Sequence, residues 1–183
     1  QRLGFIEPAP ASLGGLLIHA ASVGEVQAAR PLIDALRSEW PVHTLTVSTH
    51  SPTGARQLRS HWGETIQHVF FPIDTPGATA RFLDRLQPQL VVLVERELWP
   101  ELLLQCRQRS IPVALVNARL SEASAASYRR WQALMQPVWA QLALVATADT
   151  PTTERLRALG VPAERLLETG NLKFDQPVAA TGS

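Results

Sequence analysis

A regular alternation of short apolar runs with longer stretches of helical periodicity constrains the fold of this chain more than any other feature. Each run is rich in β-branched residues and apolar at nearly every position, as strands buried on both faces of a parallel sheet usually are. The runs occupy residues 15–21, 43–49, 67–73, 90–95, 112–118 and 143–148. The helical patterns that follow them occupy residues 25–40, 53–62, 76–86, 100–109, 124–142 and 152–160. The sequence therefore predicts an α/β fold with a doubly wound, mostly parallel, Rossmann-like sheet.

The composition narrows the class of protein. The 183 residues are enough for one domain with a hydrophobic core. A net charge of +1 gives no support for nucleic-acid binding, which usually shows a strong basic excess. The single cysteine, Cys106, excludes an internal disulfide, and no apolar run reaches the ~18 residues of a membrane-spanning helix. Because the chain starts without Met and ends in the short tail PVAATGS, we expect an excised domain.

Polar residues collect where four of the predicted strands end. In open α/β sheets, ligands bind outside the carboxyl ends of the strands. If the strands are parallel, all four groups lie along one edge of the sheet. The groups are Ser22, Gly24 and Glu25 after the first strand, Thr49, Thr53 and Gly54 after the second, Glu95, Arg96, Glu97 and Trp99 after the fourth, and Asn117, Arg119 and Ser121 after the fifth.

Most of these residues also have a purely structural interpretation. Glu25 could simply stabilise the start of a helix through the helix dipole, by ~0.3–1 kcal/mol. Thr49 and Thr53 could be plain helix caps, which we favour. Arg119 could equally be a solvated cation in a loop.

The pair Glu95 and Glu97 is harder to explain structurally, because two carboxylates at the end of an apolar strand favour a ligand-facing site. By contrast, His19 lies within an apolar strand and Cys106 within an apolar helix, so we expect both in the core. Three residues at helical spacing are also expected in the core, namely Trp131, Met135 and Trp139.

The sequence lacks the signatures of several common sites. There is no GxGxxG after a strand and no GxxxxGK[ST], so a dinucleotide site and a P-loop are both unsupported. No His, Cys and acidic residues have the spacing of metal ligands, and no serine lies in a GxSxG turn. We therefore expect no cofactor and no metal.

Five segments, read in order, carry a resemblance to one family of enzymes. They are HAASVGEVQAARPLI, STHSPTG, ERELWPE, NARLS and TGNLKFD. Together they closely resemble the Kdo transferases, which move 3-deoxy-D-manno-octulosonic acid (Kdo) from CMP-Kdo to a lipid A precursor. The resemblance covers nearly the whole chain, from the first strand to Asp175. It implies a GT-B glycosyltransferase, in which two Rossmann-like domains face each other across a cleft.

The resemblance also implies a domain organisation. Residues 1–175 would form the acceptor-binding N-terminal domain and residues 176–183 a tail or linker, with the CMP-sugar-binding C-terminal domain absent from this chain. Family members usually carry a membrane anchor, which implies the cytoplasmic face of the bacterial inner membrane. The implied partners are the lipid A precursor, CMP-Kdo and the membrane surface, and not nucleic acid. The isolated chain is expected to be inactive.

Roles for single residues follow from their positions in the family's motifs. Glu25 would be the general base, taking a proton from the acceptor hydroxyl in an inverting displacement. Arg119 would pair with an acceptor phosphate, and Glu97 would bind acceptor hydroxyls or orient neighbouring cations. Lys173 would reach the negative groups of the donor. The other acceptor-binding residues implied are Ser22, Gly24, Thr49, Thr53, Gly54, Asn117 and Ser121.

Two positions depart from the family's pattern. Arg96 stands where a Thr is usual and Glu101 where an Asn is usual, which leaves the chemistry of that loop open.

Two alternative functions also remain. One is another GT-B glycosyltransferase that acts on a lipid-linked cell-wall precursor. Such enzymes should carry Gly-rich loops after the first strand, and the segment HAASVGE is not Gly-rich, which counts against this alternative. The other is a non-catalytic domain that binds a sugar phosphate or a lipid.

Overall fold

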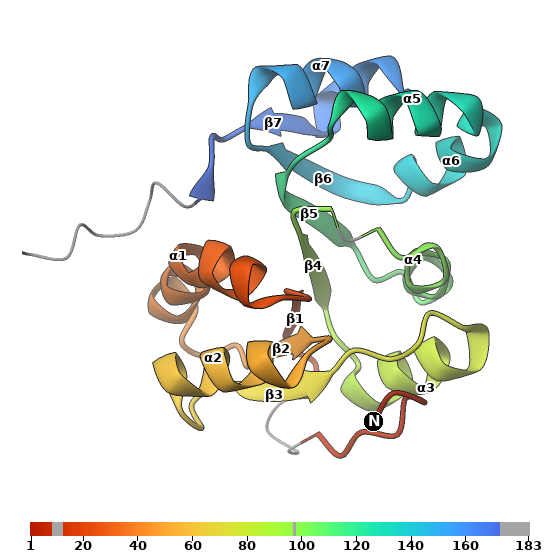
Figure 1. The fold of residues 1–183 in the computed structure, drawn as a ribbon. Helices are drawn as coiled ribbons and strands as arrows, with labels where there is room; N and C mark the ends of the chain where they lie inside the picture. Colours follow the sequence, from red (N-terminus) through yellow and green to blue (C-terminus); the bar gives the residue numbers. More distant parts are fainter. Residues whose placement is uncertain (9–12, 97, 173–183) are drawn as a thin grey trace, which may run out of the picture.

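A computed structural model describes residues 1–8, 13–96 and 98–172 of the chain. Its centre is a seven-stranded sheet with the order β3-β2-β1-β4-β5-β6-β7, in which every pairing is parallel. The predicted doubly wound, parallel α/β fold is therefore confirmed (Figure 1). The strands are β1 (Leu16–His19), β2 (Leu45–Thr49), β3 (Gln67–Phe70), β4 (Leu90–Val94), β5 (Val113–Ala118), β6 (Leu142–Thr147) and β7 (Leu166–Glu168).

Helices connect the successive strands up to β6, and a further helix follows it. They are α1 (Val23–Glu39), α2 (Pro52–Trp62), α3 (Pro76–Leu86), α4 (Pro100–Gln108), α5 (Glu122–Arg130), α6 (Gln132–Trp139) and α7 (Thr150–Ala158). Several begin with Pro in the first turn, where its missing N–H has no partner to lose. Within the described ranges, no helix is both long and apolar enough to span a bilayer.

The structure differs from the prediction between β5 and β6. The single helix expected over residues 124–142 is divided into α5 and α6, which meet at Trp131, a residue with non-helical backbone angles (φ −112°, ψ 27°). The expected burial of Trp131 is wrong, because this residue is 60% exposed. Trp139, in contrast, is 1% exposed, and Met135 packs against the core, as expected.

A seventh strand is the second difference. After α7, a short 3₁₀ helix (Ala163–Arg165) leads into β7, which pairs in parallel with β6. The chain then leaves the sheet towards Leu172, the last described residue. The predicted domain end at residue 175 and the tail over 176–183 lie outside the described residues.

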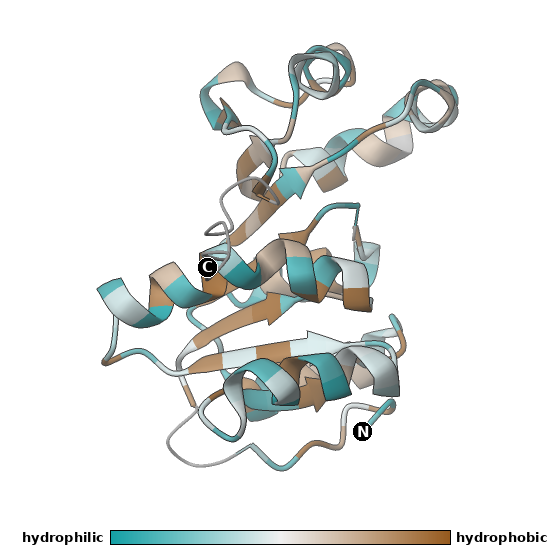
Figure 2. Cartoon of the chain, turned by 60° about the vertical axis from the view of Figure 1, so that its left-hand side comes forward, coloured by the Kyte–Doolittle hydropathy of each residue, from teal (hydrophilic) through white to brown (hydrophobic). Residues whose placement is uncertain are grey.

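Alternate residues of the central strands supply two separate hydrophobic cores. Leu17 and Leu93 belong to the core formed with α3 to α7, whereas Ile18 and Val92 belong to the core formed with α1 and α2. Figure 2 shows largely hydrophobic strands between helices in which hydrophilic and hydrophobic residues are mixed. Burial of each such side chain stabilises the fold by about 1.5–3 kcal/mol, which explains why both faces of these strands are apolar.

The strand order places the functional edge. From β1 the chain proceeds outward to β2 and β3, then crosses back to pair β4 with the other side of β1. Ligands of open α/β sheets bind at such a reversal, outside the carboxyl ends of the strands. We call this side of the sheet, where all seven strands end, the carboxyl edge.

Candidate functional site at the carboxyl edge

The loop after β1 holds Glu25 in the first turn of α1. Ser22 is the N-cap of this helix, and its Oγ accepts a hydrogen bond from the Glu25 N–H at 3.3 Å. The Glu25 carboxylate accepts from the Ser22 hydroxyl at 3.1 Å and from the Ala21 N–H at 2.7 Å. A Cβ added at the exposed Gly24 would meet only Ser22 Oγ, at 3.9 Å, so open space lies beside this turn. The half-buried Glu25 is thus held in place at the carboxyl edge.

The contacts of the loop after β2 show that the predicted cap of helix α2 was wrong. Ser51, and not Thr49 or Thr53, is the N-cap of α2, and its Oγ accepts from the Gly54 N–H at 3.1 Å. Thr49 is buried with its hydroxyl 2.9 Å from His68 Nε2, while the exposed Thr53 donates to Ser51 Oγ at 3.0 Å. A Cβ at Gly54 would lie 3.3 Å from Thr49 Cβ, so a glycine lets α2 approach the end of β2 closely.

The ends of β4 and β5 carry a second group of the predicted residues. Asn117 is buried, and its Nδ2 donates to Glu95 Oε1 at 3.4 Å. The half-buried Arg119 donates its backbone N–H to the Glu95 carbonyl, also at 3.4 Å. Ser121 is exposed and caps α5, because its Oγ accepts from the Ser124 N–H at 3.1 Å.

Backbone hydrogen bonds join these loops into one continuous edge. The His50 N–H donates to the Ala21 carbonyl at 3.0 Å, which ties the loop after β2 to the loop that holds Glu25. The Glu95 N–H donates to the Val116 carbonyl at 2.9 Å, which ties β4 to β5. The β1–β4 pairing connects the two halves.

Predicted site residues at this edge differ in their access to a ligand. Those that are exposed or half-buried are Ser22, Gly24, Glu25, Thr53, Arg119 and Ser121. The others in the described part of the chain are buried beneath the loops, namely Thr49, Gly54 and Asn117. Glu97 and Lys173 lie outside the described residues.

An aromatic cluster at the same edge was missed by sequence reasoning. The rings of His50 and Trp99 have centroids 4.9 Å apart, and Phe71 lies 5.3 Å from each. His19 stacks on Phe71 at 3.9 Å with its Nδ1 3.0 Å from Ser48 Oγ, which confirms its expected place in the core. His50 and Trp99 are half-buried. The available signal was that aromatic residues follow the ends of three different strands.

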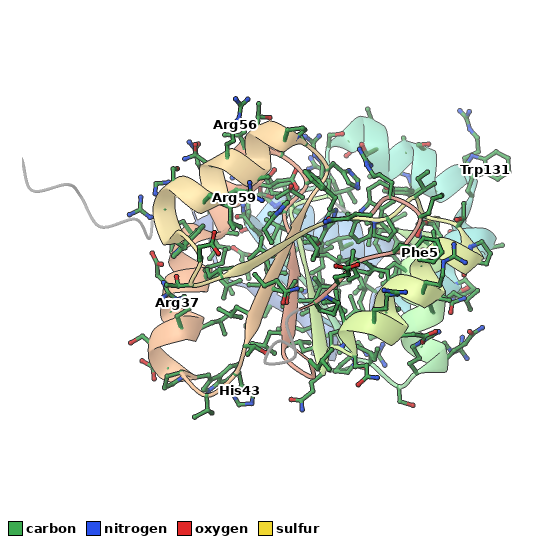
Figure 3. All side chains as sticks on the ribbon, turned by 90° about the horizontal axis from the view of Figure 1, so that it is seen from below. Phe5, Arg37, His43, Arg56, Arg59 and Trp131 are labelled. Carbon is green, nitrogen blue, oxygen red and sulfur yellow. The ribbon has the colours of Figure 1, made fainter. Side chains whose placement is uncertain are left out.

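Other charged groups lie away from this edge. A hollow of about 620 Å³ opens at the amino ends of β2 and β3, with Arg37, His43 and Arg59 among its lining residues (Figure 3). Nearby, burial lowers the pKa of His68 to about 4, and the Arg59 guanidinium adds to the shift. Among the residues that the structure describes, no three His, Cys, Asp or Glu side chains are grouped so that they could hold a metal ion.

Known proteins match the chain along nearly its whole length. A family model described as 3-deoxy-D-manno-octulosonic-acid transferase (kdotransferase) matches residues 1–176. The 3-deoxy-D-manno-octulosonic acid transferase of Haemophilus influenzae is 42% identical over 161 residues, which cover 88% of this chain and 38% of that protein. The enzyme of the same name from Bordetella pertussis is 37% identical, with 95% and 41% covered. The chain thus spans about two fifths of the length of these relatives.

Solved structures support the fold. A UDP-N-acetylglucosamine 2-epimerase superposes with a TM-score of 0.65 at 15% identity, covering 89% of this chain and 49% of that one. MurG of Acinetobacter baumannii superposes with a TM-score of 0.57 at 15% identity, covering 92% and 47%. At such identities the likeness concerns the Rossmann-like fold alone. The family match, in contrast, confirms the resemblance carried by the five motifs: the chain belongs to the 3-deoxy-D-manno-octulosonic-acid transferase family.

Proposed function

We propose that this chain is the acceptor-side domain of an inverting glycosyltransferase that moves Kdo from CMP-Kdo to a lipid A precursor. One observation carries the proposal beyond family membership. The carboxylate of Glu25 is fixed by two hydrogen bonds at the reversal point of the sheet, beside open space at Gly24. A general base needs this arrangement, because it must stand within hydrogen-bond reach of the attacking hydroxyl.

The proposed reaction is a single displacement. The acceptor hydroxyl oxygen attacks the anomeric carbon of Kdo and transfers its proton to the Glu25 carboxylate. The new carbon–oxygen bond forms as the bond to the CMP phosphate breaks, and CMP leaves with the electron pair. Attack from the face opposite the leaving group inverts the anomeric centre. Because a second domain must hold the donor, we expect the isolated chain to show no turnover.

Helix starts supply the proposed recognition of an anionic acceptor. The N-terminal turns of α1, α2 and α5 all begin at the carboxyl edge, each capped by a serine. The N–H groups and dipoles of helix starts favour phosphate. Exposed Thr53 and Ser121 offer hydroxyls, and the Arg119 guanidinium would pair with a phosphate. Glu97 and Lys173 keep the roles that the resemblance implies, on the acceptor and donor sides.

A location at the cytoplasmic face of the inner membrane is also part of the proposal. Leu3, Phe5 and Ile73 are exposed, and a hydrogen bond from the Ile73 N–H to the Arg2 carbonyl joins the two segments that carry them. The Arg81 guanidinium lies 4.8 Å from the centre of the Phe5 ring. Exposed apolar side chains beside arginines suit a surface of anionic lipid.

Ligand binding to this chain tests the assignment of the acceptor side. Titrations followed by NMR would use a bisphosphorylated lipid A headgroup and, separately, CMP-Kdo. We expect the headgroup to shift the resonances of Glu25, Thr53 and Arg119, and CMP-Kdo to shift none of them. If CMP-Kdo binds instead of the headgroup, the two sides are reversed and Glu25 loses its role as base.

A further inference from the structure

Two residues with a left-handed backbone stand out at the carboxyl edge. In the described part of the chain, four non-glycine residues have positive φ: Gln87 (49°), Glu95 (64°), Ser110 (56°) and Asn117 (51°). Gln87 directly follows α3, and Ser110 follows the C-cap residue of α4, Arg109; a left-handed residue commonly ends a helix at such positions. Glu95 and Asn117 instead stand at the ends of neighbouring strands, where the regular structure does not call for this conformation.

The register of the sheet makes these two residues neighbours. Val94 pairs with Val116, so Glu95 and Asn117 are the next residues of their strands. On its other side β5 contains a bulge, because it advances three residues from Leu115 to Ala118 while β6 advances two. Bulges are rare in parallel pairs, concentrate beside functional sites and redirect a side chain. Left-handed backbone in non-glycine residues is similarly concentrated at functional sites.

The side chain of Asn117 joins two segments that are distant in sequence. It is buried, with its Nδ2 donating to Glu95 Oε1 at 3.4 Å and its Oδ1 accepting from the Leu172 N–H at 3.2 Å. The Leu172 donor needs an oxygen, which fixes the orientation of the amide. One amide thus connects the loop after β4 to the segment by which the chain leaves the sheet after β7.

The contact between Asn117 and Glu95 also affects Arg119, the residue that we propose binds the acceptor phosphate. The Glu95 carbonyl accepts from the backbone N–H of Arg119 at 3.4 Å, so a shift of Glu95 would move the base of the Arg119 side chain. Asn117 itself is 0% exposed. An acceptor could not contact it without rearrangement of the loops above.

We propose that Asn117 is a positioning residue of the acceptor site and not a ligand of the acceptor. Its amide holds Glu95, and through Glu95 the Arg119 backbone, in register with the exit segment at Leu172. The position of Leu172 is thereby coupled to the shape of the acceptor site. This inference rests on the proposed function, since it takes the carboxyl edge as the acceptor site.

Amide hydrogen exchange on this chain tests the tether without any enzyme assay. Asn117→Gly keeps the left-handed backbone but removes the amide, so protection of the Leu172 N–H should fall about tenfold. Asn117→Asp keeps the oxygen for Leu172 but places a second carboxylate against Glu95. Protection should then persist at Leu172 and fall at Arg119. Gln87→Gly, at a left-handed position that follows α3, should change neither amide.

The pattern of exchange distinguishes a local role of Asn117 in holding Leu172 from a general loss of stability. The Thr169 N–H, which donates to the Thr147 carbonyl at 3.1 Å, reports on the pairing of the sheet near its exit. If Asn117→Gly leaves Leu172 fully protected, or exposes Thr169 to the same extent, the positioning role is wrong. The melting midpoint of each variant shows that it is folded before exchange begins.

Kinetics of the full-length enzyme provide the functional part of the test. Both Asn117 variants should lower kcat/KM for the acceptor by roughly 10- to 100-fold, as small misplacements of binding groups do. Gln87→Gly should leave this value unchanged. Unchanged values in the Asn117 variants would overturn the proposal. If the unmodified full-length protein transfers no Kdo, the proposed function fails, while the exchange experiment still decides whether Asn117 tethers Leu172 to Glu95.

Discussion

Ser22 and Glu25 are joined by two hydrogen bonds at the start of the first helix. The serine oxygen accepts from the Glu25 N–H at 3.3 Å, and the serine hydroxyl donates to the Glu25 carboxylate at 3.1 Å. The structural interpretation of Glu25 as a helix-start carboxylate is therefore correct, and it is compatible with the proposed catalytic one. A carboxylate can accept about four hydrogen bonds, so capping orients the group without preventing it from taking a proton.

Removal of this cap should cost stability. Ser22→Ala deletes the Oγ that accepts from the Glu25 N–H, and we expect the free energy of unfolding to fall by about 1 kcal/mol. Urea unfolding of this chain measures the loss. Ser60→Ala is the matched control, because Ser60 is exposed within α2 and donates to a carbonyl three residues earlier. Equal midpoints for Ser22→Ala and the unmodified chain would contradict the capping role.

Asp74 supplies a cap to a helix that lacks its own. Trp99 stands at the N-cap of α4 without a side-chain bond, and the Asp74 carboxylate accepts from the N–H groups of Glu101 and Leu102 at 3.1 and 2.9 Å. Asp74→Ala should lower the free energy of unfolding by about 1–2 kcal/mol, and Asp74→Asn by less, because the amide retains one oxygen.

Thermal or urea unfolding checks the prediction for Asp74. Asp84→Ala is the control, because the exposed Asp84 pairs with the half-buried Arg109 near the surface, and such an ion pair should contribute less than about 1 kcal/mol. An Asp74→Ala variant no less stable than Asp84→Ala would show that the cap contributes nothing.

His68 should make the fold sensitive to acid. Burial, and secondarily the Arg59 guanidinium, lower its pKa from 6.5 to about 4. As the pH falls below 6.5, His68 becomes protonated in the unfolded chain but stays neutral in the folded chain. Stability from this group is therefore lost as the pH falls from 6.5 to about 4.

Unfolding midpoints at pH 7.5 and 4.5 test this sign. His68→Gln keeps a polar group for Thr49 but cannot titrate, so it should lose less stability on acidification than the unmodified chain. His43→Gln, at an exposed position, should behave like the unmodified chain. Equal losses in all three proteins would rule out His68 as the source.

Cys106 should be inert in the folded protein. Its side chain is 0% exposed, and burial raises the pKa of its thiol to about 12, which leaves almost no reactive thiolate near neutral pH. Ellman's reagent should label it only after denaturant unfolds the chain. Complete labelling within minutes under native conditions would contradict this assignment.

Much of the fold could be predicted because the central strands are buried on both faces. Such strands are continuous apolar runs, and the six predicted runs correspond to β1–β6. β7 was missed because its three residues are half-buried or exposed and have no such pattern. Its extended form comes from pairing with β6. The break at Trp131 was missed for a similar reason, since the helical spacing of apolar residues continues across it.

The positions of the loops were predictable, but their internal contacts were not. Parallel strands must end at one edge, which located Glu25, Arg119 and the other groups from the sequence. Which hydroxyl caps α2 depends on how the loop is wound, and here Ser51 does so while Thr49 turns towards His68. Asn117 forms hydrogen bonds to Glu95, which is 22 positions away in the sequence, and to Leu172, which is 55 positions away. The spacing of residues within one segment cannot predict contacts over such distances.

The turnover of Glu25→Gln in the full-length enzyme tests the central claim most directly. Glutamine retains an oxygen for the Ala21 N–H, so folding should survive, which an unfolding curve confirms. We expect Kdo transfer to fall by about 10²- to 10⁴-fold, with acceptor binding within about threefold of the unmodified enzyme. Glu39→Gln, at the far end of the same helix, should transfer Kdo normally. A Glu25→Gln enzyme that keeps more than about a tenth of its activity would contradict Glu25 as the general base.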